Sequence, residues 1–152
     1  MLEEDEKMGK VIDSISLEKI IESFEVRSVL EGNATFRAAL NNPDTRKLEE
    51  YVEQMDHCAS GEEFLRINTL FHNEIFRISN AATHAEFVKI LVDREPLTMV
   101  VLTQKDRLRI NEEHRDIVRA LRAADGNRAE LAAKQHVLHV MADCVDRINA
   151  GE

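Results

Sequence analysis

The fold is decided by INEEHRDIVRALRAADGNRAELAAKQHVLHVMADCVDRI, residues 110–148. Apolar residues recur at spacings of three and four on both sides of the Asp-Gly-Asn sequence at 125–127. This pattern predicts two amphipathic helices, at about 107–124 and about 127–148, joined by a short turn. A short connection favours antiparallel packing of the apolar faces of two such helices.

The rest of the chain repeats this pattern. Amphipathic stretches separated by breaks predict four further helices, at about 17–40, 44–58, 62–79 and 83–104. Pro96 lies inside the last of these and should kink or split it. Leu, Ala, Glu, Arg and Ile dominate the composition, and the β-branched residues do not alternate as in strands. We therefore predict an all-α fold, an antiparallel bundle of about six helices.

Length and composition restrict the class of protein. The 152 residues suit one domain, which we place at 17–150, after a charged tail or linker at 1–16. A net charge of −9 disfavours direct binding to nucleic-acid phosphates. No apolar run is long enough to span a membrane, and no signal peptide is apparent. Cys58 and Cys144 form no CxxC motif, which predicts reduced thiols in a cytoplasmic protein.

Three histidines lie in the apolar stripes of three predicted helices: His72, His114 and His136. Imidazole is the commonest protein ligand of transition metals, and burying a polar group without a partner costs about 1–3 kcal/mol. Either each is a hydrogen-bonded core residue, or the three share a metal. Asn68, one helical turn before His72, offers a neutral carbonyl oxygen as a ligand, or hydrogen-bonds locally. His139, three residues after His136, is expected to face the same cavity.

Arg27 and Glu31 interrupt the apolar stripe of the first predicted helix. One interpretation is a plain ion pair between residues four apart. The other is a buried guanidinium that binds a carboxylate or phosphate ligand. Catalysis has little support, because the sequence contains no HExxH, no Glu-x-x-His and no GxSxG motif.

The chain resembles the FCD ligand-binding domain, the C-terminal effector domain of the FadR subfamily of GntR transcriptional regulators. The matching segments are FEVRSVLEGNATFRAAL (24–40), NTLFHNEIFRISN (68–80) and NEEHRDIVRALRAADGNRAELAAKQHV (111–137). The second is similar to the family's D-x-x-F-H…S-x-N segment, and the third to its EHR-x-I…D…H block. Together the matches extend over about residues 20–145.

The resemblance implies a site for a divalent metal, with Zn²⁺ or Ni²⁺ expected. Its ligands would be His72, His114 and His136, while Asn68 stands where the family usually has an aspartate ligand. Arg27 matches the arginine that contacts the carboxylate of the effector. The effectors of the family are small organic acids such as lactate, pyruvate or sugar acids.

We therefore expect an effector-sensing domain of a dimeric transcription regulator and not an enzyme, with Glu31 and His139 completing the ligand-binding residues. Such regulators contact DNA through a winged-helix domain, which residues 1–16 cannot contain. The chain is then either an excised effector domain or a natural single-domain relative. A small metalloenzyme that uses Glu31 as its base is the alternative function, and a structural helical module without metal is a third.

Overall fold

The computed structural model describes the backbone of residues 2–151 and the side chains of residues 17–151. This part of the chain contains six α-helices, one short 3₁₀ helix and no strand, which confirms the all-α prediction. The elements are α1 (Leu2–Leu40), α2 (Arg46–Asp56), α3 (Gly61–Ser79), α4 (Ala82–Val92), η1 (Leu97–Val100), α5 (Gln104–Arg122) and α6 (Gly126–Asn149). The predicted tail or linker at 1–16 lies outside the residues whose side chains are described. Within the described residues, no helix is both long and apolar enough to cross a bilayer.

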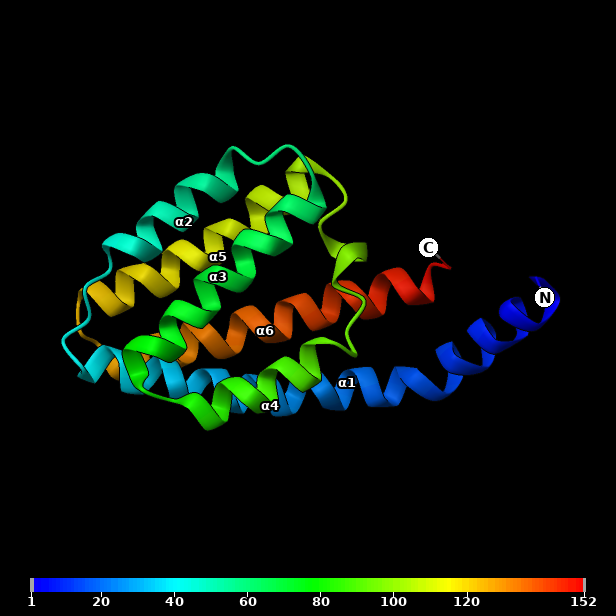
Figure 1. The fold of residues 1–152 in the computed structure, drawn as a ribbon, viewed down its shortest axis with the longest axis horizontal. Coiled ribbons are helices and arrows are strands. Elements are labelled where there is room, and N and C mark those ends of the chain that lie inside the picture. Colours follow the sequence, from blue (N-terminus) through cyan, green and yellow to red (C-terminus); the bar gives the residue numbers. More distant parts are fainter. Residues whose placement is uncertain (1, 152) are drawn as a thin grey trace.

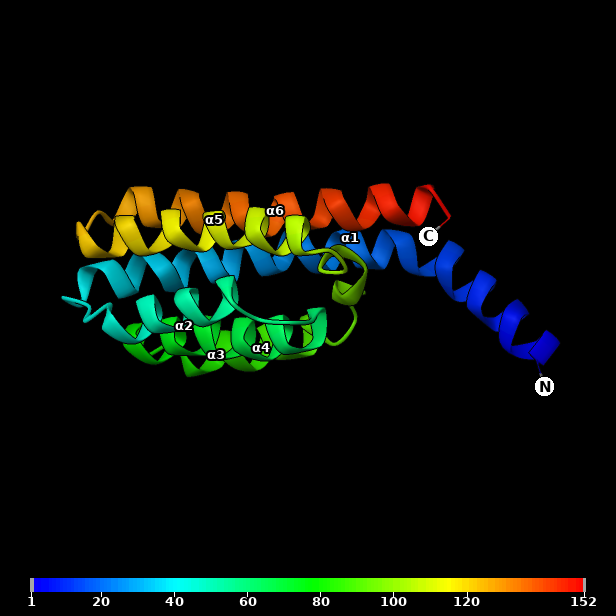
Figure 2. The ribbon, with the colours of Figure 1, turned by 90° about the horizontal axis from the view of Figure 1, so that it is seen from above.

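The helices pack as an antiparallel bundle (Figure 1). The two long helices α1 and α6 lie side by side and run in opposite directions. Figure 2 shows α5 and α6 in one layer, α2, α3 and α4 in another, and α1 between them. The residues singled out in the sequence lie on α1, α3, α5 and α6. Helix α1 contacts each of the other three.

Pro96 divides the fourth predicted helix, as expected. Helix α4 ends at Val92, a turn follows, and η1 occupies Leu97–Val100. The predicted range of 83–104 was therefore wrong beyond Val92. Proline lacks an amide hydrogen and disfavours helical backbone in the residue before it, so the chain turns at this point and places Glu95 between two short helical elements.

Local signals fix both ends of α3. The Ser60 hydroxyl oxygen accepts a hydrogen bond from the backbone N–H of Glu63 at 3.1 Å, which caps the first turn. A Cβ atom at Gly61 would lie only 2.8 Å from the carbonyl oxygen of Val101, so this close approach requires glycine. Asn80 ends the helix in the left-handed conformation, with φ of 54°. These features determine where α3 sits relative to the rest of the bundle.

The core lies between the layers and draws on all the long helices. Its fully buried apolar side chains include Phe24, Leu48, Phe64, Phe71, Ile117, Leu121 and Val137. Helices α1 and α6 approach closely, since a Cβ atom at Gly32 would lie 2.7 Å from Cγ of Lys134. Several polar residues are buried in the same interior, among them Arg27, Glu31 and His114. Buried polar groups need partners, and those partners define the site.

Candidate metal and ligand site

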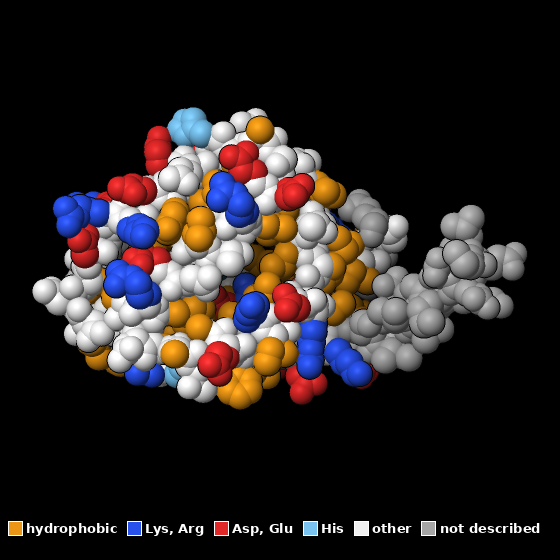
Figure 3. All heavy atoms as spheres, viewed as in Figure 1, with side chains coloured by type: hydrophobic (Ala, Val, Ile, Leu, Met, Phe, Trp, Pro, Cys, Tyr) orange, Lys and Arg blue, Asp and Glu red, His pale blue; other side chains and the backbone are white. Residues whose placement is uncertain are grey.

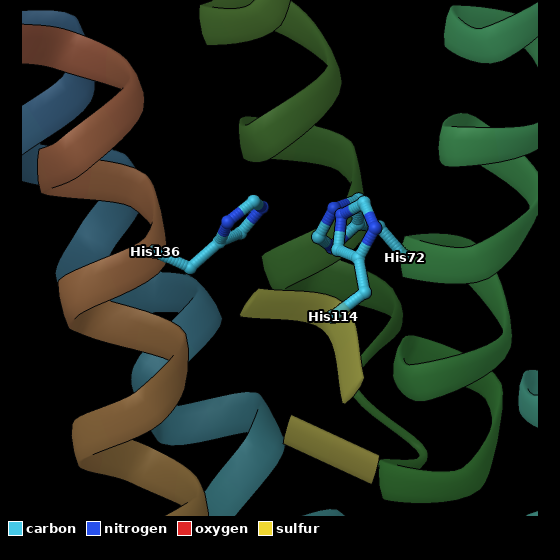
Figure 4. Close-up of side chains that lie close together, drawn as sticks. All are labelled: His72, His114 and His136. Atoms are coloured by element: carbon cyan, nitrogen blue, oxygen red, sulfur yellow. The ribbon is translucent and has the colours of Figure 1, made fainter. Parts of the chain in front are cut away.

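Three imidazoles converge inside the bundle: His72 from α3, His114 from α5 and His136 from α6 (Figure 4). Their ring centroids lie between 4.7 and 5.5 Å apart. One nitrogen of each ring lies within 4.8 Å of the corresponding nitrogens of the other two. Ligand atoms in a tetrahedral zinc site are about 3.4 Å apart, so a small inward rotation of the rings reaches coordinating distance. The three predicted histidines are thus brought together and could hold a metal ion.

The tautomer of His114 is fixed by its neighbour Asn111. The side-chain amide of Asn111 donates to the carbonyl oxygen of Val52 at 2.9 Å and to Asp56 Oδ1 at 2.8 Å, so its Oδ1 is left as an acceptor. His114 Nδ1 lies 2.9 Å from that oxygen and must donate its hydrogen there. The unprotonated Nε2 consequently carries a lone pair. Among the described residues, it is the buried side-chain polar atom for which no partner is found.

His136 is oriented by a carboxylate. Its Nδ1 lies 2.9 Å from Oε1 of Glu113, while the imidazole is only 3% exposed. A ring nitrogen that donates to a carboxylate leaves the other nitrogen as a lone pair, here on the side of the other two histidines. Carboxylate–histidine pairs of this kind orient imidazoles that bind metals.

His72 has an oxygen next to each ring nitrogen. Its Nε2 lies 3.1 Å from Oδ1 of Asn68, and its Nδ1 lies 3.2 Å from Oε1 of Glu31. A neutral imidazole has one ring hydrogen, so whichever nitrogen carries it, the lone pair of the other faces an oxygen acceptor. A cation bound to both Nε2 and Asn68 Oδ1 removes this conflict, as does a turn of the Asn68 amide. The Asn68 oxygen therefore lies next to a candidate ligand atom of His72.

Two of the imidazoles, those of His72 and His114, are held in the neutral form that binds metals. Burial lowers the pKa of His72 to about 3, although the nearby Glu31 carboxylate opposes the shift. Burial likewise lowers the pKa of His114 well below its usual value, and the proximity of His136 and His72 adds to this effect. A protonated imidazole cannot bind a metal. At neutral pH these rings therefore need not lose a proton to coordinate one.

A cleft of about 750 Å³ opens beside the histidines, between α1, α3 and α4. Its polar lining includes Arg27, Glu31, Asn68, His72 and Glu95, and its walls are largely apolar. Figure 3 shows this face hollowed near its centre, with hydrophobic side chains around the hollow and charged ones at its rim. The cleft thus joins two of the candidate metal ligands, Asn68 and His72, to the buried arginine of α1.

Arg27 is bound by two carboxylates. Its Nε donates to Glu31 Oε2 at 2.5 Å, and its Nη1 donates to Glu95 Oε1. The residue is 3% exposed, and its guanidinium also lies over the ring of Phe24, 5.3 Å from the centroid. The ion-pair interpretation of Arg27 and Glu31 is thereby confirmed, and a second carboxylate that the sequence did not reveal is added.

The two carboxylates respond differently to this burial. Burial disfavours the ionised form of Glu31, but the charge of Arg27 and the hydrogen bond from Arg27 outweigh it, so the pKa of Glu31 is lowered. Burial raises the pKa of Glu95 despite the opposing attraction of Arg27. Glu31 is therefore a permanent anion here, whereas the negative charge of Glu95 is costly to keep in place.

His139 lies on the outer side of α6. Its imidazole is 60% exposed, and its Nδ1 lies 2.5 Å from Oε2 of Glu113. It does not line the cleft that contains Arg27, so its role in ligand binding stays a prediction. Sequence reasoning missed three residues, Glu95, Asn111 and Glu113. A signal existed for Asn111, whose spacing of three from His114 places both on one helix face.

A family model matches most of the chain. The family described as the FCD domain matches residues 22–139, which is more than three quarters of the sequence. No curated protein matches the chain. The matched range contains all three histidines, Asn68 and Arg27.

Proposed function

The chain belongs to the FCD domain family, and we propose that it is a metal-dependent sensor of small organic acids within a transcription regulator of the GntR type. The FCD domain is a regulatory ligand-binding domain. The observation that carries the proposal is the buried, unpartnered lone pair of His114 Nε2, directed into a cluster of three imidazoles. Leaving such an atom without a partner costs about 1–3 kcal/mol, and metal coordination removes that cost.

The proposed metal is Zn²⁺ or Ni²⁺, bound by His72, His114 and His136 with the Asn68 oxygen beside them. Imidazole nitrogen suits both ions. All four groups are neutral, so the ion keeps its full charge and attracts an anionic ligand. Three or four protein ligands also leave room for a further donor from that ligand.

The proposed effector is a small carboxylic acid that occupies the cleft beside the metal. A volume of about 750 Å³ lies within the range of small-molecule sites. Arg27 and the apolar walls supply a cation and a desolvated environment, the combination that favours carboxylate binding. Glu31 orients Arg27, and His139 is proposed as an outer contributor through Glu113.

Regulation would follow if the effector binds one conformation of the domain more tightly than another. If the effector prefers one arrangement of α1, α3 and α4, its binding shifts the population toward that arrangement. We propose that the domain acts as a homodimer and that its DNA contact runs through a winged-helix domain.

The alternative of a metalloenzyme requires a free general base close to the metal. Glu31, the candidate base, has Oε2 bound to Arg27 and Oε1 beside His72. A carboxylate held in this way, with a lowered pKa, is a poor proton acceptor. The geometry therefore favours ligand binding over catalysis.

Metal analysis tests the first half of the proposal. Protein purified without chelator is expected to contain close to one equivalent of a divalent transition metal, and His114→Ala should abolish that content. His57→Ala is the matched control, because His57 is an exposed histidine at the end of α2. A wild-type protein that neither retains nor takes up Zn²⁺ or Ni²⁺ would refute the metal site.

A thermal-shift panel of small carboxylic acids tests the second half. Stabilisation by an acid should require the metal and should be lost in Arg27→Gln, since a ligand that binds the native state raises its melting temperature. The same acid should give no shift in protein stripped with EDTA. Equal stabilisation of stripped and loaded protein would contradict a metal-anchored ligand.

A further inference from the structure

Arg27, which lines the cleft, already binds two carboxylates through two of its donor nitrogens. Arg27 Nε binds Glu31, and Arg27 Nη1 binds Glu95. Glu95 is secured on its other oxygen, where Ser23 Oγ lies 2.9 Å from Oε2. One guanidinium charge is thus shared between two buried acids, and a third carboxylate entering the cleft would be repelled by both.

The two acids lie on different kinds of backbone. Arg27 and Glu31 stand one turn apart on α1, and Glu31 also lies beside His72, so Glu31 is fixed by its helix and by the histidine cluster. Glu95 belongs to the turn between α4 and η1. Its backbone N–H donates to the carbonyl of Val92 at 3.0 Å, a local turn contact that can change without breaking a helix.

We propose that Glu95 competes with the effector for Arg27. The carboxylate of Glu95 binds Arg27 when no effector is bound, and the carboxylate of the effector displaces it. This inference rests on the proposed function, because it concerns the same cleft. It makes Glu95 a specificity-determining residue: an acid must bind Arg27 and the metal strongly enough to replace a carboxylate that is already in place.

Exchange of Glu95 for the carboxylate of the effector leaves the charge of Arg27 balanced. The incoming carboxylate replaces one negative charge at Arg27 by another, so the arginine keeps two acidic partners. The released Glu95 carboxylate moves toward solvent, where its ionised form is no longer penalised by burial. Since burial raises the pKa of Glu95 in the ligand-free state, release also removes an unfavourable burial of charge.

Displacement of Glu95 would move the wall of the cleft. Residues of α4, together with Glu95, Pro96 and Leu97, line the same cavity as Arg27. The outer face of α4 exposes Phe87 and Ile90, at 55% and 52%. A ligand that releases Glu95 is therefore expected to shift α4 and the apolar side chains that it presents to the surface.

The test compares Glu95→Gln with wild type, using Zn²⁺-loaded protein and L-lactate as the probe in isothermal titration. Removing the competing charge is expected to lower the Kd for lactate by about tenfold to a hundredfold, the range for a hydrogen bond to a charged group. The matched control is Glu74→Gln, which removes a buried carboxylate on α3 that pairs with Arg77 outside the cleft. It should leave the Kd unchanged.

A second variant guards against misfolding of the first. Ser23→Ala removes the hydroxyl group that lies 2.9 Å from Glu95 Oε2 and 3.0 Å from the carbonyl oxygen of Leu91. It should lower the Kd for lactate by about twofold to tenfold, as expected for one hydrogen bond to Glu95. Wild-type binding without tightening in either variant, or weaker binding in Glu95→Gln, overturns the inference and leaves the proposed function standing. Binding of lactate by none of these proteins overturns the inference too, while the Zn²⁺ content of the same samples tests the metal site separately.

Discussion

Asn68→Asp changes the charge of one proposed metal ligand and little else. The two side chains have nearly the same shape, and Asn68 Oδ1 already lies 3.1 Å from His72 Nε2. Ligand atoms in a tetrahedral zinc site are about 3.4 Å apart, so the oxygen needs only a small movement to coordinate. The substitution should therefore act through charge alone, with opposite effects in the presence and absence of metal.

The expected magnitudes follow from the surroundings of residue 68. An anionic partner adds about 1–1.5 kcal/mol relative to a neutral one, which lowers the Kd for Zn²⁺ by about fivefold to tenfold. Without metal, the new carboxylate joins Glu31 and Glu95 in one cleft. Two like charges about 8 Å apart repel by about 2 kcal/mol at an effective dielectric of about 20. Allowing for partial exposure, we expect about 1 kcal/mol, or a Tm lowered by about 2–4 °C.

The assay is competition with a chromophoric chelator for Zn²⁺, combined with thermal unfolding in EDTA and in excess Zn²⁺. Asn73→Asp is the matched control, because it adds the same charge five residues further along α3, on an exposed side chain that lines the same cleft but is not a proposed ligand. It should leave the Kd for Zn²⁺ within about threefold of wild type, the scale of a screened surface interaction.

Two results would refute the reasoning. If Asn68→Asp binds Zn²⁺ no more tightly than wild type, residue 68 is not a ligand, and its amide is hydrogen-bonded to His72 instead. If Asn73→Asp tightens binding equally, the effect is a general electrostatic one. A higher Tm of the Asn68→Asp variant in EDTA would also contradict the crowding of carboxylates on which the estimate depends.

Three further outcomes are expected. Glu113→Gln should weaken Zn²⁺ binding by about tenfold to a hundredfold in the chelator assay, because it removes an orienting carboxylate; an unchanged Kd would contradict this role. Cys58 and Cys144 should be silent toward Ellman's reagent at pH 8 and react only after denaturation, since burial raises the pKa of both thiols, that of Cys144 to about 12. In EDTA, His72 and His114 should contribute stability that is complete above pH 6.5 and is lost as pH falls, because both pKa values are lowered in the fold, that of His72 to about 3; each adds about 1.4 kcal/mol per pH unit to the slope in urea unfolding, and His72→Asn should reduce that slope.

Helical periodicity was sufficient for the fold and for the central residues of the site. The spacing of apolar residues predicted the helices, and the same spacing placed His72, His114 and His136 inward, where the structure brings them together. Arg27 and Glu31 stood out because they occupied positions that should have been apolar. Residues that violate a pattern can be recognised from the pattern itself.

Residues that obey the pattern of an exposed helix face could not be recognised in this way. Glu113 is adjacent in sequence to His114, but the side chains of successive helical residues diverge by about 100°. The structure shows that it serves a different histidine, His136, across the α5–α6 contact. Glu95 was assigned to the predicted helix at about 83–104, next to the expected break at Pro96, and its contact with Arg27 spans 68 positions of sequence. Such pairings are set by tertiary packing, and no local spacing encodes them.

The position of the carboxylates has a consequence for what the site can bind. The four groups nearest the proposed metal are neutral, whereas Glu31, Glu95 and Glu113 lie one contact further out, each next to an arginine or a histidine. A site that used these acids as ligands would neutralise the ion and lose its attraction for an anion. Because they are one contact away from the proposed metal, these carboxylates orient Arg27 and the imidazoles without neutralising the ion. The charge of the ion is then available to attract the ligand. An aspartate at position 68 would shift this balance, so tighter metal binding in Asn68→Asp should be accompanied by weaker binding of the carboxylate.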